Sequence, residues 1–159
     1  MSWRPSIYRC DIEPQWIDYN GHLRDAYYAL VFSQAIDALM DEVGLDHGYR
    51  ARTSCTLYTL EMHVHFLDEV KSTDEISVSA RAIGIDSKRI HVALALRCAR
   101  RAEPAALGEF MLLHVRQDPT VRSAVFPPEI QQRLEQWLAA DAQSPLPALG
   151  SRTMTLPRR

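Results

Sequence analysis

The most regular hydrophobic pattern in the chain runs from residue 27 to residue 43. Within it, apolar side chains recur three and four positions apart, at Phe32, Ala35, Ile36, Leu39, Met40 and Val43. This spacing predicts an α-helix. Further apolar residues cover most of the remaining surface, so we expect other structure to wrap around this helix. Gly44 follows the last apolar position and is expected to end the helix.

Beyond residue 53 the apolar residues alternate with polar ones, a period that predicts β-strands. Four strands are expected, over residues 54–66, 75–84, 89–100 and 107–118. Short connections suit hairpins between the last three, which implies an antiparallel meander. A first strand is expected within residues 6–12. A short helix is expected from Pro127-Pro128, with an apolar face of Ile130, Leu134, Trp137 and Leu138.

The predicted order of elements belongs to the α+β class. An antiparallel sheet wrapped around one long buried helix would bury the apolar helix and satisfy the strand pattern together. The chain has 159 residues, a length that suits one domain. We expect this domain over residues 1–141, followed by an extended or partly disordered tail over residues 142–159, where prolines recur without periodicity.

Charge and composition exclude several classes of protein. The formal net charge is -2, so no basic excess points to nucleic acid. No apolar run resembles a signal peptide or a membrane span. The 3 cysteines are widely spaced, which fits reduced thiols in a cytoplasmic protein rather than a disulfide framework. His63 and His65 share one strand face with Glu61, but no second cluster completes a metal site, so no metal or cofactor is expected.

Residues suited to catalysis gather in the turn that leads into the predicted helix. Asp18, Asn20, His22, Arg24 and Asp25 lie within a few positions of one another. A helix N-terminus presents unpaired N–H groups and a partial positive charge, which can stabilise an oxyanion. A carboxylate beside it can attack an acyl carbon or activate a water molecule. Asp18 is the candidate for that carboxylate; its alternative is a role as a turn or cap residue.

This segment resembles a known family. Asp18-Tyr19-Asn20-Gly21-His22 and the following Ala26 and Tyr28 are similar to the Asp-x-x-Gly-His-x-x-x-Ala-x-Tyr signature of the 4-hydroxybenzoyl-CoA thioesterase-like proteins, which have the hotdog fold. A second block, Val64-His65-Phe66-Leu67 with Asp74 after it, also resembles that family. The resemblance implies one hotdog domain, acting as a homodimer or homotetramer, that hydrolyses an acyl-CoA to a free acid and CoA.

The resemblance also implies roles for individual residues. Asp18 falls on the catalytic carboxylate, as nucleophile or general base, with Gly21 and His22 on the motif glycine and histidine. Backbone amides near Gly21 to Arg24, or from the partner subunit, would hold the oxyanion. Many members carry Val-Asn-Asn after the histidine, whereas this chain has Leu23-Arg24-Asp25, which puts charge at the mouth of the pocket.

The run from Asp18 to Tyr28 is most similar to thioesterases of carnitine degradation, whose substrate is betainyl-CoA. A trimethylammonium acyl group suits an aromatic cage. The candidate walls are Trp16, Tyr19, Tyr27, Tyr28 and Tyr58. Arg24 and Asp25 complete the predicted substrate-binding set, with Asp25 as a counter-charge. Ordinary core packing of the aromatic residues, and a local ion pair between Arg24 and Asp25, are the alternatives.

The predicted CoA-binding residues are Ser87, Lys88 and Arg89, in the hairpin before the third long strand, where the cations would meet phosphates. Arg50 and Arg52 are alternatives, and a solvated hairpin tip is the simpler interpretation. Two other functions stay open. A hotdog hydratase or dehydratase also uses Asp and His near a helix start, although it typically carries Asn-Pro where Asn20-Gly21 stands here. A non-catalytic acyl-CoA-binding module is the second.

Overall fold

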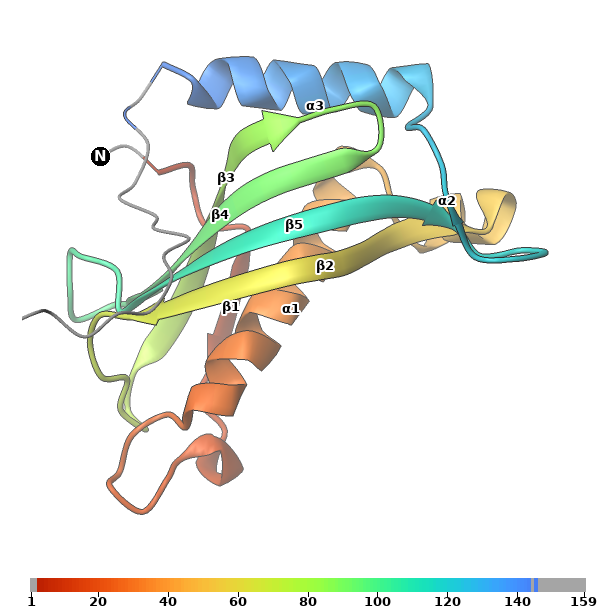
Figure 1. Ribbon diagram of the computed structural model, residues 1–159. Helices are drawn as coiled ribbons and strands as arrows, with labels where there is room; N and C mark the ends of the chain where they lie inside the picture. Colours follow the sequence, from red (N-terminus) through yellow and green to blue (C-terminus); the bar gives the residue numbers. More distant parts are fainter. Residues whose placement is uncertain (1–2, 144, 146–159) are drawn as a thin grey trace, which may run out of the picture.

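The computed structural model describes residues 3–143 and residue 145. In chain order the elements are β1 (Tyr8–Asp11), the 3-10 turn η1 (Pro14–Trp16), α1 (Asp25–Val43), α2 (His47–Thr53), β2 (Cys55–Phe66), β3 (Glu75–Ile85), β4 (Arg89–Cys98), β5 (Ala106–Arg116), β6 (Arg122–Ser123) and α3 (Pro128–Asp141). The strands form one antiparallel sheet in the order β1-β3-β4-β5-β2, with β6 paired to β5 (Figure 1). The predicted meander is therefore β3-β4-β5. Most of the predicted tail lies outside the described residues.

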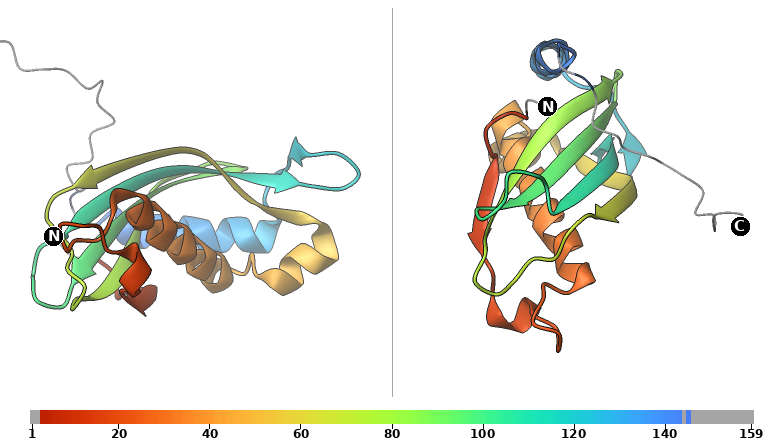
Figure 2. Two further views of the ribbon diagram at one scale, coloured as in Figure 1. Left: turned by 90° about the horizontal axis from the view of Figure 1, so that it is seen from below. Right: turned by 90° about the vertical axis from the view of Figure 1, so that its left-hand side faces the viewer.

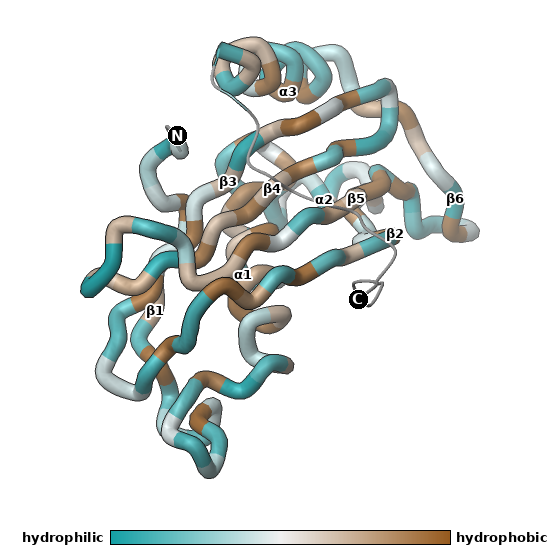
Figure 3. Tube along the Cα trace, turned by 60° about the vertical axis from the view of Figure 1, so that its left-hand side comes forward, coloured by the Kyte–Doolittle hydropathy of each residue, from teal (hydrophilic) through white to brown (hydrophobic). Residues whose placement is uncertain are grey.

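The long apolar helix is buried as the sequence predicted. α1 lies across the concave side of the curved sheet (Figure 2). Val31, Phe32 and Ala35 have no exposed surface, and the ring of Phe32 meets that of Phe110 on β5 edge to face at 5.8 Å. α1 ends at Gly44, whose φ of 88° is costly for residues with a side chain. Figure 3 shows the alternating hydropathy of the strands that cover this helix.

α2 did not follow from the hydrophobic pattern. It has 7 residues and only Tyr49 is buried, so it carries no apolar stripe of its own. The side chain of Asp46 caps it by accepting a 2.7 Å hydrogen bond from the backbone N–H of Tyr49. Tertiary contacts of Tyr49 hold the helix in place.

α3 covers an edge of the sheet that would otherwise be unpaired. β1 pairs with β3 only from Glu75 to Val78. Farther along β3, the backbone N–H of Ala82 donates to a carboxylate oxygen of Asp141 at 2.8 Å, at the end of α3. Arg4 contacts the other oxygen of Asp141 at 3.1 Å. An exposed strand edge invites pairing with other chains, and this helix removes part of that risk.

A buried hydrogen-bond chain joins α2 to β5. The Tyr49 hydroxyl lies 2.9 Å from Nε2 of His114, and Nδ1 of His114 lies 2.9 Å from the carbonyl oxygen of Ala124. Because a carbonyl only accepts, Nδ1 carries the proton, so Nε2 accepts from Tyr49. His114 is 1% exposed, and burial lowers the pKa of its imidazole. The folded protein therefore favours neutral His114.

We expect the free energy of unfolding to fall as the pH drops below about 6.5, the ordinary histidine pKa. In that range the unfolded chain binds a proton at His114 that the folded chain does not, because the folded pKa is lowered. The loss is up to about 1.4 kcal/mol per pH unit, ending below the folded pKa. Thermal melting of the wild type and of His114→Gln between pH 5 and 8 tests this. Equal pH dependence in both proteins would show that His114 makes no contribution.

Candidate active site

A tight turn between β1 and α1 presents the predicted catalytic residue. The N–H of Gly21 donates to the carbonyl oxygen of Asp18 at 3.1 Å, and the N–H of Asp18 donates to the carbonyl oxygen of His22 at 2.8 Å. Gly21 has a φ of 80°, which explains why a glycine suits this position. The predicted turn at Asn20-Gly21 is confirmed, and it places Asp18 just before the N-terminus of α1.

The two carboxylate oxygens of Asp18 have different surroundings. Oδ1 accepts the backbone N–H of Asn20 at 2.8 Å and that of His22 at 3.1 Å. Within the part of the chain that the structure describes, Oδ2 has one long contact, 3.4 Å, with the Asn20 side-chain amide. The N–H of His22, followed by that of Asn20, holds the pKa of Asp18 below its usual value. Asp18 is therefore ionised at neutral pH, with Oδ1 fixed by the turn and Oδ2 available for chemistry.

Within one chain, the backbone amides from Gly21 to Arg24, which were expected to hold an oxyanion, already make internal hydrogen bonds, whereas donors from the partner subunit stay a prediction. The N–H groups of Gly21 and His22 donate to Asp18, that of Leu23 to the carbonyl oxygen of Val70, and that of Arg24 to the carbonyl oxygen of Trp16. An N–H that makes an internal bond would have to break it to stabilise an oxyanion. Among the described residues, the next N–H, that of Asp25 at the start of α1, meets no acceptor.

His22 is held by a glutamate that sequence reasoning missed. Its Nε2 lies 2.8 Å from Oε2 of Glu69, while Oε1 of Glu69 lies 3.0 Å from Nζ of Lys71. The Lys71 ammonium, ahead of His22, lowers the pKa of Glu69. Glu69 lies in the loop between β2 and β3, just beyond the second block that resembled the family. No local motif marks it, because its partner is far away in sequence.

A hollow opens beside His22 at the N-terminus of α1. Its walls are His22, Asp25 and Tyr28 on one side and Phe66, Asp68 and Glu69 on the other. Tyr28 is buried and meets the ring of Phe66 edge to face at 5.0 Å. Phe66 is 54% exposed. The structure thus brings the predicted residues His22, Asp25 and Tyr28 together.

Most of the chain matches a known protein family. The family described as the thioesterase-like superfamily matches residues 12–134, which include the turn, the hollow and the whole sheet except β1. The chain belongs to the thioesterase-like superfamily.

Individual relatives agree with this membership. The betainyl-CoA thioesterase of Pseudomonas aeruginosa is 43% identical over 99% of this chain and 98% of that protein. The L-carnitine dehydrogenase/betainyl-CoA thioesterase of Agrobacterium fabrum is 36% identical over 89% of this chain, which matches 28% of that longer protein.

Solved structures share the fold. A Pseudomonas putida protein described as a thioesterase has a TM-score of 0.83 and 39% identity, covering 98% of this chain and 99% of its own. A Staphylococcus aureus protein solved in complex with CoA has a TM-score of 0.87 and 24% identity over 99% of both chains, which shows the fold alone. The predicted hotdog fold and the predicted acyl-CoA thioesterase are both confirmed.

Four predicted substrate-binding residues of the thioesterase lie outside the hollow, namely Trp16, Tyr19, Arg24 and Tyr58. Trp16 is buried and stacks on Tyr27, with ring centroids 5.5 Å apart and planes 18° apart, so this pair packs the entry to α1. Tyr19 is 93% exposed at the tip of the turn. Arg24 is exposed, and the described residues contain no ion pair between it and Asp25. The predicted cage of five aromatic side chains therefore does not form within one chain.

Tyr58 and the predicted CoA-binding residues lie at the opposite end of the sheet from the hollow. Arg89 is paired with Leu113, and Leu113 is paired with Tyr58, so they form one row across β4, β5 and β2. The Tyr58 hydroxyl accepts from the Gln117 side chain at 3.0 Å. Arg89 makes a 2.6 Å ion pair with Asp86. Ser87 and Lys88 precede this row in the β3–β4 connection, so one chain does not bring them to Asp18.

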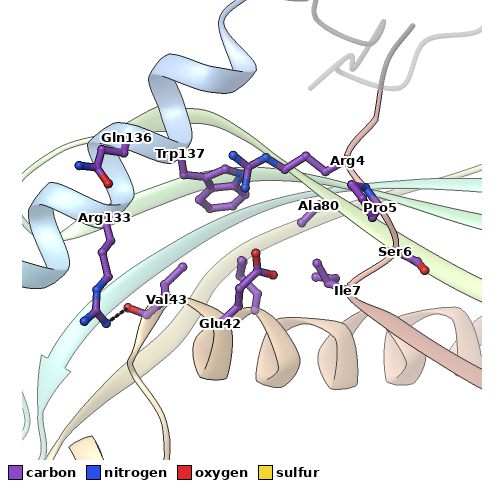
Figure 4. A pocket seen from close by; sticks show the side chains of 11 residues that line it. Arg4, Pro5, Ser6, Ile7, Glu42, Val43, Ala80, Arg133, Gln136 and Trp137 are labelled. Atoms are coloured by element: carbon purple, nitrogen blue, oxygen red, sulfur yellow. Dashed lines mark hydrogen bonds between the residues drawn. The ribbon is translucent and has the colours of Figure 1, made fainter.

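A second hollow of the thioesterase holds none of the predicted site residues. It lies between α1, α3 and residues 4–7, where Arg4 stands over the ring of Trp137 and Arg133 donates to the carbonyl oxygen of Val43 (Figure 4).

Within residues 3–143, no group of three or more His, Cys, Asp or Glu side chains is arranged to hold a metal ion; His63 instead bonds to Glu61 at 2.6 Å. In the same range, no helix is long and apolar enough to span a membrane.

Proposed function

We propose that this thioesterase hydrolyses betainyl-CoA to betaine and CoA. The observation that carries the proposal is the 43% identity to the betainyl-CoA thioesterase of Pseudomonas aeruginosa, over 99% of this chain and 98% of that protein. The hollow supports it, because it offers the exposed ring of Phe66 and the carboxylate of Asp25 to a cationic acyl group.

Asp18 acts as the nucleophile in the proposed reaction. Its lowered pKa keeps it ionised at neutral pH, and the ionised carboxylate is the form that can attack an acyl carbon. Oδ2 of Asp18 attacks the thioester carbonyl, the oxyanion collapses, and CoA leaves as a thiolate. Water then hydrolyses the acyl-aspartate anhydride and releases the acid. A water activated by Asp18 is the alternative route.

The N–H of Asp25 is the proposed oxyanion donor. It stands at the N-terminus of α1, a 19-residue helix whose dipole adds partial positive charge at that end. Besides acyl-CoA, this route consumes only water, so we infer that the enzyme needs neither a metal nor a redox cofactor.

A homodimer would complete the site through β2. Among the described residues, β2 pairs with β5 alone, so its other edge is free, and its exposed apolar side chains include Leu60, at 56%, and Met62, at 44%. Antiparallel pairing of two β2 edges about a twofold axis would bury these side chains. It would also bring the Tyr58 end of one strand beside the Phe66 end of the other. The predicted CoA-binding residues would then approach the partner's catalytic turn. A tetramer stays a prediction.

The test is thiol release, followed with a thiol-reactive dye, from betainyl-, acetyl-, octanoyl- and benzoyl-CoA. We expect the highest kcat/KM with betainyl-CoA. A preference for another acyl group would refute the proposed substrate while the enzyme class stands. Binding of every acyl-CoA without thiol release would instead indicate a binding module, and hydration without thiol release a hydratase.

A further inference from the structure

The carboxylates around the hollow beside His22 differ in whether they have a positively charged partner. Glu69 is paired with Lys71 and His22, and Asp68 contacts the guanidinium of Arg101. Asp25 also lines the hollow, but within the described residues its carboxylate accepts only the neighbouring N–H of Ala26, at 2.8 Å. Of the carboxylates that line this hollow, that of Asp25 therefore has no cationic partner among the described residues.

The aromatic wall of the hollow lies next to that carboxylate. Phe66 is 54% exposed, which is a cost for an apolar ring in water unless something covers it. The buried ring of Tyr28 packs against the ring of Phe66 edge to face, with the ring centroids 5.0 Å apart. Tyr28 and Asp25 are predicted substrate-binding residues, whereas Phe66 is not; the fold brings Phe66 to them from the far end of β2.

We propose that Asp25, Tyr28 and Phe66 form the subsite that selects a quaternary ammonium acyl group. This inference rests on the proposed function and names the residues that would set its substrate preference. A trimethylammonium group has no N–H to donate, so it is recognised by aromatic faces and by a nearby negative charge. Phe66 supplies the accessible face and Asp25 the charge.

The shortness of the betainyl group supports Asp25 in particular. Its nitrogen is only two bonds from the thioester carbonyl carbon. The cation site and the oxyanion donor must therefore be neighbours. Asp25 offers both from one residue, its N–H toward the oxyanion and its carboxylate toward the ammonium, at the first position of α1. Asp25→Asn removes the charge while keeping the backbone N–H.

The experiment compares betainyl-CoA with 3,3-dimethylbutyryl-CoA, in which a tert-butyl group replaces trimethylammonium at nearly the same size. The ratio of their kcat/KM values isolates recognition of the charge. We expect the wild type to prefer betainyl-CoA, and Phe66→Leu or Asp25→Asn to lower the ratio by about 2- to 30-fold each. Phe66→Tyr should retain it. Asp41→Asn, an exposed carboxylate near the other end of α1, is the matched control and should leave the ratio unchanged.

Calorimetric binding of both acyl groups, as analogues with a methylene in place of the thioester sulfur, keeps the two proposals separate. Tighter binding of the cationic analogue, lost in Phe66→Leu and Asp25→Asn, would support the subsite even if betainyl-CoA were not hydrolysed. Hydrolysis of betainyl-CoA with unchanged ratios in both variants would overturn the subsite and leave the proposed function intact.

Discussion

Replacing Asp18 with asparagine is expected to lower kcat for acyl-CoA hydrolysis by about a hundredfold or more, the effect expected for an essential nucleophile or acid–base group. Asparagine is the informative replacement because its side-chain oxygen can still accept the N–H groups of Asn20 and His22 that Oδ1 accepts now. The turn is retained and the negative charge is lost. Thiol release from betainyl-CoA is the measurement, with melting temperature as the check on folding.

Asp46→Asn provides the control for this prediction. Asp46 also binds a backbone N–H through its side chain, that of Tyr49, but it caps α2 instead of lying before α1. Asparagine is an equally good cap, so both stability and hydrolysis should stay near wild type. If Asp18→Asn kept its melting temperature and more than about a tenth of the wild-type rate, Asp18 would be a turn residue and the proposed mechanism would be wrong.

Leu60→Glu should separate the proposed dimer and lower hydrolysis by about a hundredfold. Leu60 lies in the edge strand β2, at the irregularity in its pairing with β5, and is 56% exposed. A glutamate there would place two like charges close to the proposed twofold axis. A site that has lost its partner wall would position substrate poorly, and misplacement of that kind has costs on the order of a hundredfold. Sedimentation velocity and thiol release are the two measurements.

Val125→Glu is the matched control for Leu60→Glu. Val125 is also an exposed apolar residue, 67% exposed, but it lies between β6 and α3, away from the β2 edge. This variant should sediment and hydrolyse substrate like the wild type. A fully active Leu60→Glu monomer would show that one chain holds a complete site, and a Leu60→Glu dimer would place the interface elsewhere.

Much of the fold was predictable because its elements carry their own patterns. α1 has an apolar period long enough to identify a buried helix, and the observed helix begins only two residues before the predicted range. The long strands carry apolar residues at alternate positions over much of their length, because successive side chains of a strand point to opposite faces of the sheet. α2 and the two-residue β6 are short elements that tertiary contacts stabilise, so no local pattern marked them.

The residues of the site fall into the same two groups, those held by one local segment and those brought together from distant segments. Asp18, Gly21 and His22 belong to one short segment, so their spacing was visible in the sequence, and the turn they form is local. Glu69 and Phe66 reach His22 and Tyr28 from another part of the chain, across a separation that no motif records. The occupied amides of Leu23 and Arg24 depend on such contacts too, since the acceptor of Leu23 is Val70.

The sequence by itself determined the class of the fold, the burial of α1 and the presence of a carboxylate before that helix. Each of these depends on the order of residues within one segment, where backbone geometry relates spacing to position. Only the tertiary structure decided which N–H groups remain free, which carboxylate lacks a partner, and which aromatic ring faces the hollow. Those features arise when the sheet curls around α1 and brings the end of β2 to the start of the helix. Their distances depend on the packing of the whole chain.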